Sequence, residues 1–175
     1  MFCDGELLQR GEEKPIGETE KWINVGYKLK GPSSKVLSNL FPYEFVFRGK
    51  HLNGIETFFQ GIKIKNKNTQ EYVFKYSGLD SNNIKAASDF DWKGSGIVYW
   101  QGKEIKRDSD EYDNIVDELY ISAIQNPLYR NVLKNINKPI IHSMGEVDKK
   151  KTVFTRYEFE FMLNCLVEFL KLERW

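Results

Sequence analysis

The sequence predicts an α+β fold of a single domain in which helix outweighs strand. Three observations lead to this prediction: apolar residues recur at helical spacing in several segments, strand-like segments are short, and no internal repeat or linker divides the chain. The 175 residues are 41% hydrophobic and 14% aromatic. That composition suffices for one substantial core, whereas two cores would be cramped.

Residues 1–35 form an N-terminal extension that is rich in Gly, Glu and Lys. We expect one strand in this extension, at residues 21–30, and we expect the extension to pack on the rest of the chain. The inward side chains of the strand are expected to be Trp22, Val25 and Tyr27. Residues 31–35, "GPSSK", are typical of a loop.

A hairpin that leads into a helix is predicted next. Residues 43–52 have the hairpin pattern, with Arg48 and Gly49 as the turn. Asn53 ends the second strand, and because Asn is a favoured N-cap we expect it to cap a helix over residues 54–65.

The predicted helix over residues 54–65 carries two stripes of side chains. The first stripe is apolar and must face the core, because it follows the i, i+3, i+4, i+7 rule: Ile55, Phe58, Phe59 and Ile62. The second stripe is polar, is rotated by about 100° from the first, and is expected at the edge of the core: Glu56, Gln60 and Lys63.

The middle of the chain is predicted to supply scaffold and one candidate functional loop. Two short helices are expected at residues 69–77 and 83–90, with a loop of Gly, Asp, Ser and Asn between them. Residues 91–105 mix glycines with β-branched and aromatic residues. This mixture predicts a loop with a short extended piece that could carry function.

The last third is predicted to be mainly helical. Asp108 and Glu111 match the capping-box spacing before a helix over residues 112–126, and Pro127 starts another helix. The apolar face of the first of these helices is expected to consist of Ile115, Leu119 and residues 121–124.

A short strand and a charged loop are expected before the final helix. They lie at residues 138–145 and 146–151. Thr155 and Glu158 have capping-box spacing and are expected to open that helix. Its apolar face is expected to contain Phe159, Met162, Leu163, Leu166 and Leu170.

The composition restricts the expected cellular location and the kinds of molecule that the protein could bind. The chain has no run of eighteen apolar residues and no secretory signal at its start, so we expect a cytoplasmic protein that makes no membrane contact. Cys3 and Cys165 lie far apart and are expected to be reduced thiols. The formal net charge of +1 provides no global field to hold a polyanion, which disfavours binding to bare DNA.

Several common catalytic signatures are missing. The sequence has no P-loop, its glycines are wrongly spaced for a dinucleotide turn, and no G-x-S-x-G elbow occurs. His51 and His142 lack partners at metal-ligand spacing, so we expect neither a metal nor a cofactor. Acid and electrostatic chemistry by carboxylates remains, which suits cleavage of a glycosidic bond. From the residues alone, a glutamate such as Glu56 is more often a solvated acid in the first turn, where it favours the helix N-terminus, than a functional group.

The order of five motifs points to a family. The chain has "LSNL" at 37–40, then Phe41-Pro42, "RGKHLNGIETFFQGIK" at 48–63, "KAA" at 85–87 and "YWQGKEI" at 99–105. Together, over about residues 36–170, they resemble the NADAR family, also called YbiA-like, whose members have S-N, then E-x-Y/F-x-Q-x-x-K, then a Trp-containing segment. Residues 36–175 are accordingly expected to form a YbiA-like (NADAR) domain.

The resemblance implies a hydrolase with N-glycosidase activity on an ADP-ribosyl or phosphoribosyl conjugate. One branch of the family is linked to a phosphoribosyl-type intermediate of riboflavin synthesis, and another removes ADP-ribose from modified guanine in DNA. We expect the second activity here, with ADP-ribosylated DNA among the candidate partners. The resemblance also implies the site residues: Glu56, Trp100 and Asp148 as catalytic, and Ser38, Asn39, Phe59, Gln60, Lys63, Gly102 and Lys103 as substrate-binding.

Departures from the family pattern leave some assignments open. Many members have His directly after the glutamate, where this chain has Thr57. Trp92 competes with Trp100 for the family's tryptophan, and Glu146 competes with Asp148 for the late acid. The alternative functions are a non-hydrolytic ADP-ribose or NAD-binding module, an N-glycosidase for a small phosphoribosyl metabolite, and an interaction protein that reuses the fold.

Overall fold

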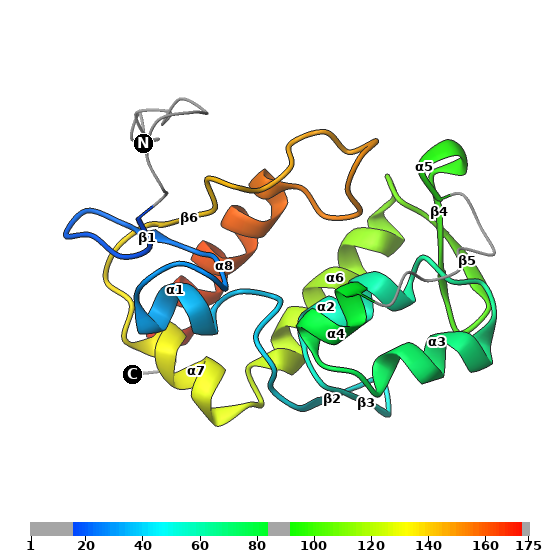
Figure 1. Ribbon diagram of the computed structural model, residues 1–175, viewed down its shortest axis with the longest axis horizontal. Helices are drawn as coiled ribbons and strands as arrows, with labels where there is room; N and C mark the ends of the chain where they lie inside the picture. The colour runs from blue at the N-terminus through cyan, green and yellow to red at the C-terminus, as the bar shows by residue number, and fades with distance from the viewer. Residues whose placement is uncertain (1–15, 84–91, 173–175) are drawn as a thin grey trace.

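The computed structural model describes residues 16–83 and 92–172, which form a mixed helical and stranded molecule (Figure 1). The first half contains β1 (Ile23–Asn24), α1 (Pro32–Val36), β2 (Phe45–Phe47), β3 (Lys50–Leu52), α2 (Ile55–Gly61), α3 (Lys67–Phe74) and α4 (Gly78–Asn83). The second contains α5 (Trp92–Ser95), β4 (Ile97–Trp100), β5 (Lys103–Lys106), α6 (Asp110–Ala123), α7 (Pro127–Lys134), β6 (Ile140–Ile141) and α8 (Arg156–Leu172). The predicted α+β class, with more helix than strand, is confirmed.

Helix α6 runs through the middle of the molecule and contacts α2, α8 and β2 (Figure 1). Its buried side chains join a core shared with those elements: Tyr112, Ile115, Val116, Leu119, Tyr120 and Ala123. The predicted apolar face is therefore confirmed at Ile115 and Leu119. It is wrong at Ile121, which is 47% exposed because it lies on the opposite side of the helix.

Two antiparallel hairpins use the same turn chemistry. In β2–β3 the turn residues Arg48 and Gly49 have φ of 46° and 75°, and in β4–β5 Gln101 and Gly102 have φ of 50° and 84°. Two consecutive left-handed residues match the right-handed twist of the flanking strands. The first hairpin was predicted. The second corrects the expectation of a loop over residues 91–105.

Strand β1 pairs with β6 in parallel, with Ile23 opposite Ile140 (Figure 1). The predicted inward positions are only partly right, since Val25 is buried whereas Trp22 and Tyr27 are half-buried. Strand alternation fails here because the strand is only two residues long, and Ile23 and Asn24 are both buried.

Helix α1 replaces the loop that was expected at residues 31–35. Its first residue is Pro32, which is pre-organised for a helix start. The carboxylate of Glu18 accepts hydrogen bonds from the backbone N–H groups of Ser33 and Ser34, at 2.6 and 3.1 Å. A carboxylate from outside the segment therefore caps this helix, which the local sequence could not reveal.

Helix α2 confirms the predicted apolar stripe, whose four members are at most 3% exposed: Ile55, Phe58, Phe59 and Ile62. Its N-cap is Gly54 and not Asn53, whose side-chain amide instead donates to the carbonyl of Lys75 at 2.7 Å. Gly54 has a φ of 147°, and a Cβ there would lie 3.2 Å from the carbonyl oxygen of Phe41. The chain needs glycine at this entry to the helix.

The capping box predicted at the start of α8 is confirmed, whereas the cap predicted for α6 is wrong. At α8, Thr155 and Glu158 bond reciprocally, with Thr155 N donating to Glu158 Oε2 at 2.6 Å and Glu158 N donating to Thr155 Oγ1 at 3.3 Å. At α6 the cap is Ser109 and not Asp108, because the hydroxyl of Ser109 accepts from Tyr112 N at 3.2 Å.

The predicted helices of the middle segment are shifted. The first is α3, and the Gly, Asp, Ser and Asn residues expected as a loop are helical in α4. The hydroxyl of Ser77 donates to Asp80 Oδ2 at 2.9 Å at the start of that helix. The helix expected at residues 83–90, with the "KAA" motif, lies outside the described residues except for Asn83.

Gln70 is a buried polar residue that joins three elements. Its amide nitrogen donates to the carbonyls of Gly61, Ile64 and Tyr99 at 2.9, 3.3 and 3.0 Å. Its amide oxygen accepts from the backbone N and the side chain of Gln101, both at 2.9 Å. Gln70 thereby fixes the C-terminal end of α2 against the β4–β5 hairpin.

Replacement of Gln70 by leucine is expected to lower the free energy of unfolding by about 3 kcal/mol, because three buried carbonyl oxygens lose a side-chain donor. Urea denaturation measures this loss. The matched control is Gln101→Leu, which removes one half-buried partner and is expected to lower stability by less than about 1 kcal/mol. Equal losses for the two variants would contradict the central role of Gln70.

Candidate functional site

A cavity of about 380 Å³ lies between α2, residues 38–40 and two later segments, 142–146 and 152–156. Its volume falls within the range of about 300–1,000 Å³ that is usual for small-ligand sites. Six of the ten predicted site residues line it: Ser38, Asn39, Glu56, Phe59, Gln60 and Lys63.

The polar stripe of α2 forms one connected row along the cavity. Gln60 Nε2 donates to Glu56 Oε1 at 2.6 Å, and Lys63 Nζ donates to Gln60 Oε1 at 3.1 Å. The amide of Gln60 thus holds the carboxylate on one side and the ammonium on the other. This geometry follows from the spacing i, i+4, i+7 on one helix face.

Burial changes the protonation of both charged members of this row. It raises the pKa of Glu56 above its ordinary value, while the hydrogen bond from Gln60 and the charge of Lys63 act in the opposite direction. Burial likewise lowers the pKa of Lys63, and Glu56 opposes that change. A carboxyl group with a raised pKa is suited to accept and return a proton during a reaction.

Residues 38–40 and α6 hold the start of α2 in place. The backbone N–H of Glu56 donates to the carbonyl of Asn39 at 3.0 Å. The hydroxyl of Tyr120, on α6, donates to Asn39 Oδ1 at 2.9 Å. The side chain of Asn39 is therefore oriented by the core, and its backbone carbonyl fixes the start of α2 at Glu56.

Aromatic side chains form an apolar part of the cavity wall. The ring of Phe59 stacks on that of Phe154, with centroids 4.9 Å apart and planes inclined by 18°. Phe154 also lies 5.7 Å, centroid to centroid, from the ring of Tyr120. Such a surface offers a stacking partner for a planar base.

Two polar residues that sequence reasoning did not select line another part of the cavity. Arg156, the first residue of α8, and His142 both line the cavity, and both are held by Glu160. Arg156 Nε and the backbone N of His142 donate to Glu160 Oε1 at 2.8 and 2.6 Å. The nearest signal in the sequence was the Thr155 and Glu158 capping box, which placed a helix start beside Arg156.

The ring of His142 is fixed by the pairing of β1 with β6. Its Nδ1 lies 2.8 Å from the carbonyl oxygen of Val25, which can only accept, so Nδ1 carries the hydrogen. Burial lowers the pKa of His142. The neutral ring then has Nε2 as an acceptor.

Trp100 is not brought to the cavity. It packs in the core with ring centroids 5.0 Å from Phe47, 5.8 Å from Phe58 and 5.6 Å from Phe74, and it is 9% exposed. Trp92 lies beside the end of the polar row, with Lys63 Nζ 5.9 Å from the centroid of its ring.

Three further predicted residues lie away from the cavity. Asp148 is in the charged loop, where its carboxylate accepts from Lys150 N at 2.9 Å. Gly102 forms the β4–β5 turn, and Lys103 pairs with Glu111 on the protein surface. Glu146, the competitor of Asp148, does line the cavity. Hydrogen bonds from the backbone N–H groups of Asp148 and Val147 hold the pKa of Glu146 below its ordinary value.

Thr57 does not line the cavity. It is fully buried, and its hydroxyl donates to the carbonyl of Gly54 at 2.7 Å. The residue after Glu56 therefore faces the interior of the protein, and its departure from the family pattern leaves the row of Glu56, Gln60 and Lys63 intact.

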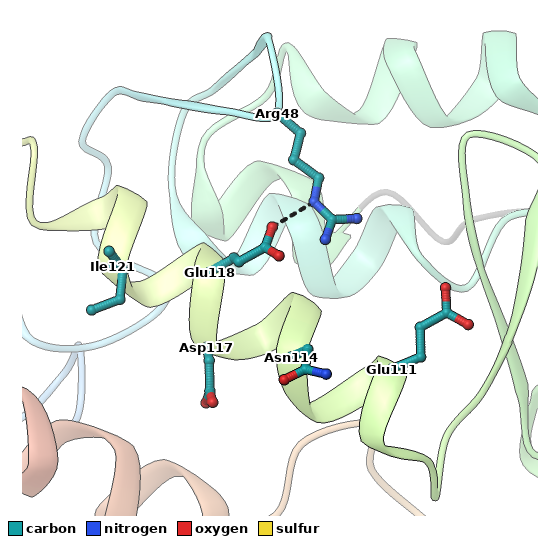
Figure 2. A pocket seen from close by; sticks show the side chains of 6 residues that line it. All are labelled: Arg48, Glu111, Asn114, Asp117, Glu118 and Ile121. Atoms are coloured by element: carbon teal, nitrogen blue, oxygen red, sulfur yellow. Dashed lines mark hydrogen bonds and ion pairs between the residues drawn. The ribbon is translucent and has the colours of Figure 1, made fainter.

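A second hollow, of about 580 Å³, lies on the exposed side of α6 (Figure 2). Figure 2 shows Arg48 paired with Glu118 across it, at 2.7 Å between Nε and Oε2. It contains none of the predicted site residues. No group of three or more His, Cys, Asp or Glu side chains placed to hold a metal occurs within residues 16–83 and 92–172.

Comparisons with known proteins agree with this architecture. The family model described as bacteriophage protein GP30.3 matches residues 31–168. An uncharacterised 17.1 kDa protein from the Gp30–rIII intergenic region of Enterobacteria phage T4 is 32% identical over 147 residues, which cover 82% of this chain and 95% of that protein. The NMR structure of the E. coli protein YbiA matches with a TM-score of 0.57 at 13% identity, covering 91% of this chain and 90% of that one. In the part of the chain that the structure describes, no helix has the length and apolar character needed to span a membrane.

Proposed function

The chain belongs to the bacteriophage GP30.3 protein family, a NADAR/YbiA-like family, and from this premise we propose that it is an N-glycosidase that removes ADP-ribose from a modified base such as guanine in DNA. The observation that carries the proposal is the row of Glu56, Gln60 and Lys63 in one cavity, with the pKa of Glu56 raised by burial.

The chemistry of N-glycoside hydrolysis matches this row. As the bond from C1 of the ribose to the base nitrogen breaks, positive charge develops on the sugar, and the carboxylate of Glu56 stabilises it. Glu56 also accepts a proton from the water whose oxygen bonds to C1, and returns a proton to the leaving nitrogen. One water is consumed and the protonation of Glu56 is restored.

Cationic side chains on both walls support the binding of a phosphorylated substrate. Lys63 lies on the α2 side and Arg156 on the α8 side of the same cavity. Arg156 uses Nε for Glu160, so its two terminal NH₂ groups are the ones suited to bidentate contact with phosphate oxygens. Phe154, which is half-buried and stacks on Phe59, offers the stacking surface for the base.

The test of the proposal is incubation of the wild type and of Glu56→Gln with DNA that carries ADP-ribosylated guanine, with released ADP-ribose followed by mass spectrometry. We expect release by the wild type alone. A phosphoribosyl amine serves as a parallel substrate, and calorimetry with free ADP-ribose measures binding. Tight binding without release from any conjugate would favour the binding module, and release from the small substrate alone would favour the metabolite glycosidase.

The pH dependence of cleavage offers a further prediction. Glu56 must be ionised to accept the proton from water, so the rate falls as the pH drops through its pKa. Lys63 lowers that pKa, and its replacement by methionine removes the opposing charge. We therefore expect the acidic limb of the single-turnover rate profile to move to higher pH in Lys63→Met. The exposed Lys65→Met is the control, and a shift to lower pH in Lys63→Met would contradict the assignment.

A further inference from the structure

His142 provides the cavity with a hydrogen-bond acceptor that the cleavage step does not use. Its Nδ1 lies 2.8 Å from the carbonyl oxygen of Val25, so the hydrogen of the neutral ring is on Nδ1 and the lone pair is on Nε2. Within residues 16–83 and 92–172, no protein group donates a hydrogen bond to Nε2. Burial lowers the pKa of His142, which keeps the ring neutral at neutral pH. The wall of the cavity therefore contains an uncharged acceptor in a fixed orientation.

Gly145 brings His142 and Arg156 together in this wall. A Cβ at Gly145 would lie 2.6 Å from Cδ2 of His142 and 2.8 Å from Cβ of Arg156, so a larger residue would have to displace one of them. Cδ2 is bonded directly to Nε2 in the imidazole ring, which places the acceptor close to this contact. Glu160 fixes the pair, because Arg156 Nε and the backbone N of His142 both donate to its Oε1.

An uncharged acceptor beside a guanidinium group requires a ligand with two different neighbouring groups. Phosphate oxygens accept hydrogen bonds, so a phosphate suits the terminal NH₂ groups of Arg156 and not Nε2 of His142. A hydroxyl group can donate to Nε2. In a ribose 5-phosphate unit the sugar follows the phosphate directly, whereas a base is separated from that phosphate by the whole sugar. The neighbour of a phosphate-binding arginine is therefore expected to meet a sugar hydroxyl.

We propose that His142 is a specificity-determining residue whose Nε2 accepts a hydrogen bond from a ribose hydroxyl of the substrate, while Arg156 binds the adjacent phosphate. The two side chains form a ribose-phosphate subsite between β6 and α8. The inference rests on the proposed function for the class of substrate, but it concerns binding and not cleavage.

The test compares two small probes, ribose 5-phosphate and inorganic phosphate, by NMR titration at about pH 8, where phosphate is mainly a dianion without a hydrogen to donate. The wild type is expected to bind ribose 5-phosphate about tenfold more tightly than inorganic phosphate. In His142→Asn the side-chain amide can still donate to the carbonyl of Val25, but no acceptor remains at the position of Nε2. We expect this variant to bind ribose 5-phosphate about tenfold more weakly and inorganic phosphate unchanged.

Two further variants separate the acceptor from the shape of the ring. His142→Gln restores a carbonyl oxygen near the position of Nε2 and is expected to bind ribose 5-phosphate within about threefold of the wild type. Gly145→Ala keeps the imidazole but displaces it, and the same selective loss as in His142→Asn is expected. The matched control is His51→Asn, at an exposed histidine of β3, which is expected to change neither affinity. Melting temperatures are measured on the same preparations.

Three results would overturn the proposal. The first is a wild type that does not prefer ribose 5-phosphate to inorganic phosphate, and the second is an unchanged affinity of His142→Asn for ribose 5-phosphate. The third is an equal loss for both probes in folded His142→Asn, because the imidazole would then bind the phosphate itself. Neither probe has a glycosidic bond to a base, so selective binding without cleavage of any conjugate would refute the proposed function and leave the subsite standing.

Discussion

Glu56→Gln is expected to lower the rate of glycosidic cleavage by about 10³-fold or more while leaving ADP-ribose bound. The amide keeps the shape and the contact with Gln60 but can neither accept the proton from water nor stabilise positive charge on the sugar. Single-turnover rates and calorimetry on the same preparations measure the two effects. The control is Glu104→Gln, an exposed carboxylate on the β4–β5 hairpin. A loss of less than tenfold in Glu56→Gln would contradict its catalytic role.

The same substitution is expected to raise the melting temperature at neutral pH. Burial raises the pKa of Glu56 in the folded state, so the unfolded chain loses this proton at a lower pH than the folded protein does. Ionised Glu56 therefore destabilises the fold increasingly as pH rises from its unfolded pKa through its folded pKa. The stability gain of Glu56→Gln is expected above the unfolded pKa and should vanish below it. A variant that is less stable than the wild type at neutral pH would contradict this sign.

The second large effect is expected on substitution of Trp100, which should lower the stability of the fold and leave catalysis unaffected. Its ring contacts Phe47, Phe58 and Phe74 in the core, so Trp100→Ala should lower the free energy of unfolding by about 3–5 kcal/mol. Chemical denaturation gives this value directly.

Trp100→Phe separates the structural role from the catalytic role that the family resemblance implied. Phenylalanine keeps most of the packing, so we expect a folded protein with a cleavage rate within a factor of about three of the wild type. Trp92→Phe is the comparison, because Trp92 neighbours Lys63. A folded Trp100→Phe that loses cleavage by 10²-fold would restore the catalytic role of Trp100.

Local periodicity is the reason that the part of the candidate cavity formed by α2 was predictable. The two stripes of α2 depend only on residues within one helix, so the burial of Phe58 and the alignment of Glu56 with Lys63 could be predicted from spacing. The capping box of Thr155 and Glu158 is local in the same way.

The other parts of the fold and of the cavity could not be predicted, because they depend on contacts between segments that lie far apart in the sequence. Helix α1 is capped by Glu18, and the Arg156 wall is held by Glu160 and by the pairing of β1 with β6. The β4–β5 turn at Gln101 and Gly102 was a local feature, but Gln-Gly is a weaker hairpin signal than Asn-Gly. The side of the hairpin on which Trp100 lies was therefore not predictable.

The parallel pairing of β1 with β6 has a consequence for the order of folding. Val25 and His142 are 117 residues apart in the chain, and the ends of so long a loop meet late because closing it costs entropy that local contacts must first offset. During synthesis, α2 and the hairpins can form before β6, the strand that pairs with β1, has been made. The row of Glu56, Gln60 and Lys63 would then exist before the part of the cavity formed by His142 and Arg156, and the cavity would be complete only when the last quarter of the chain has been made.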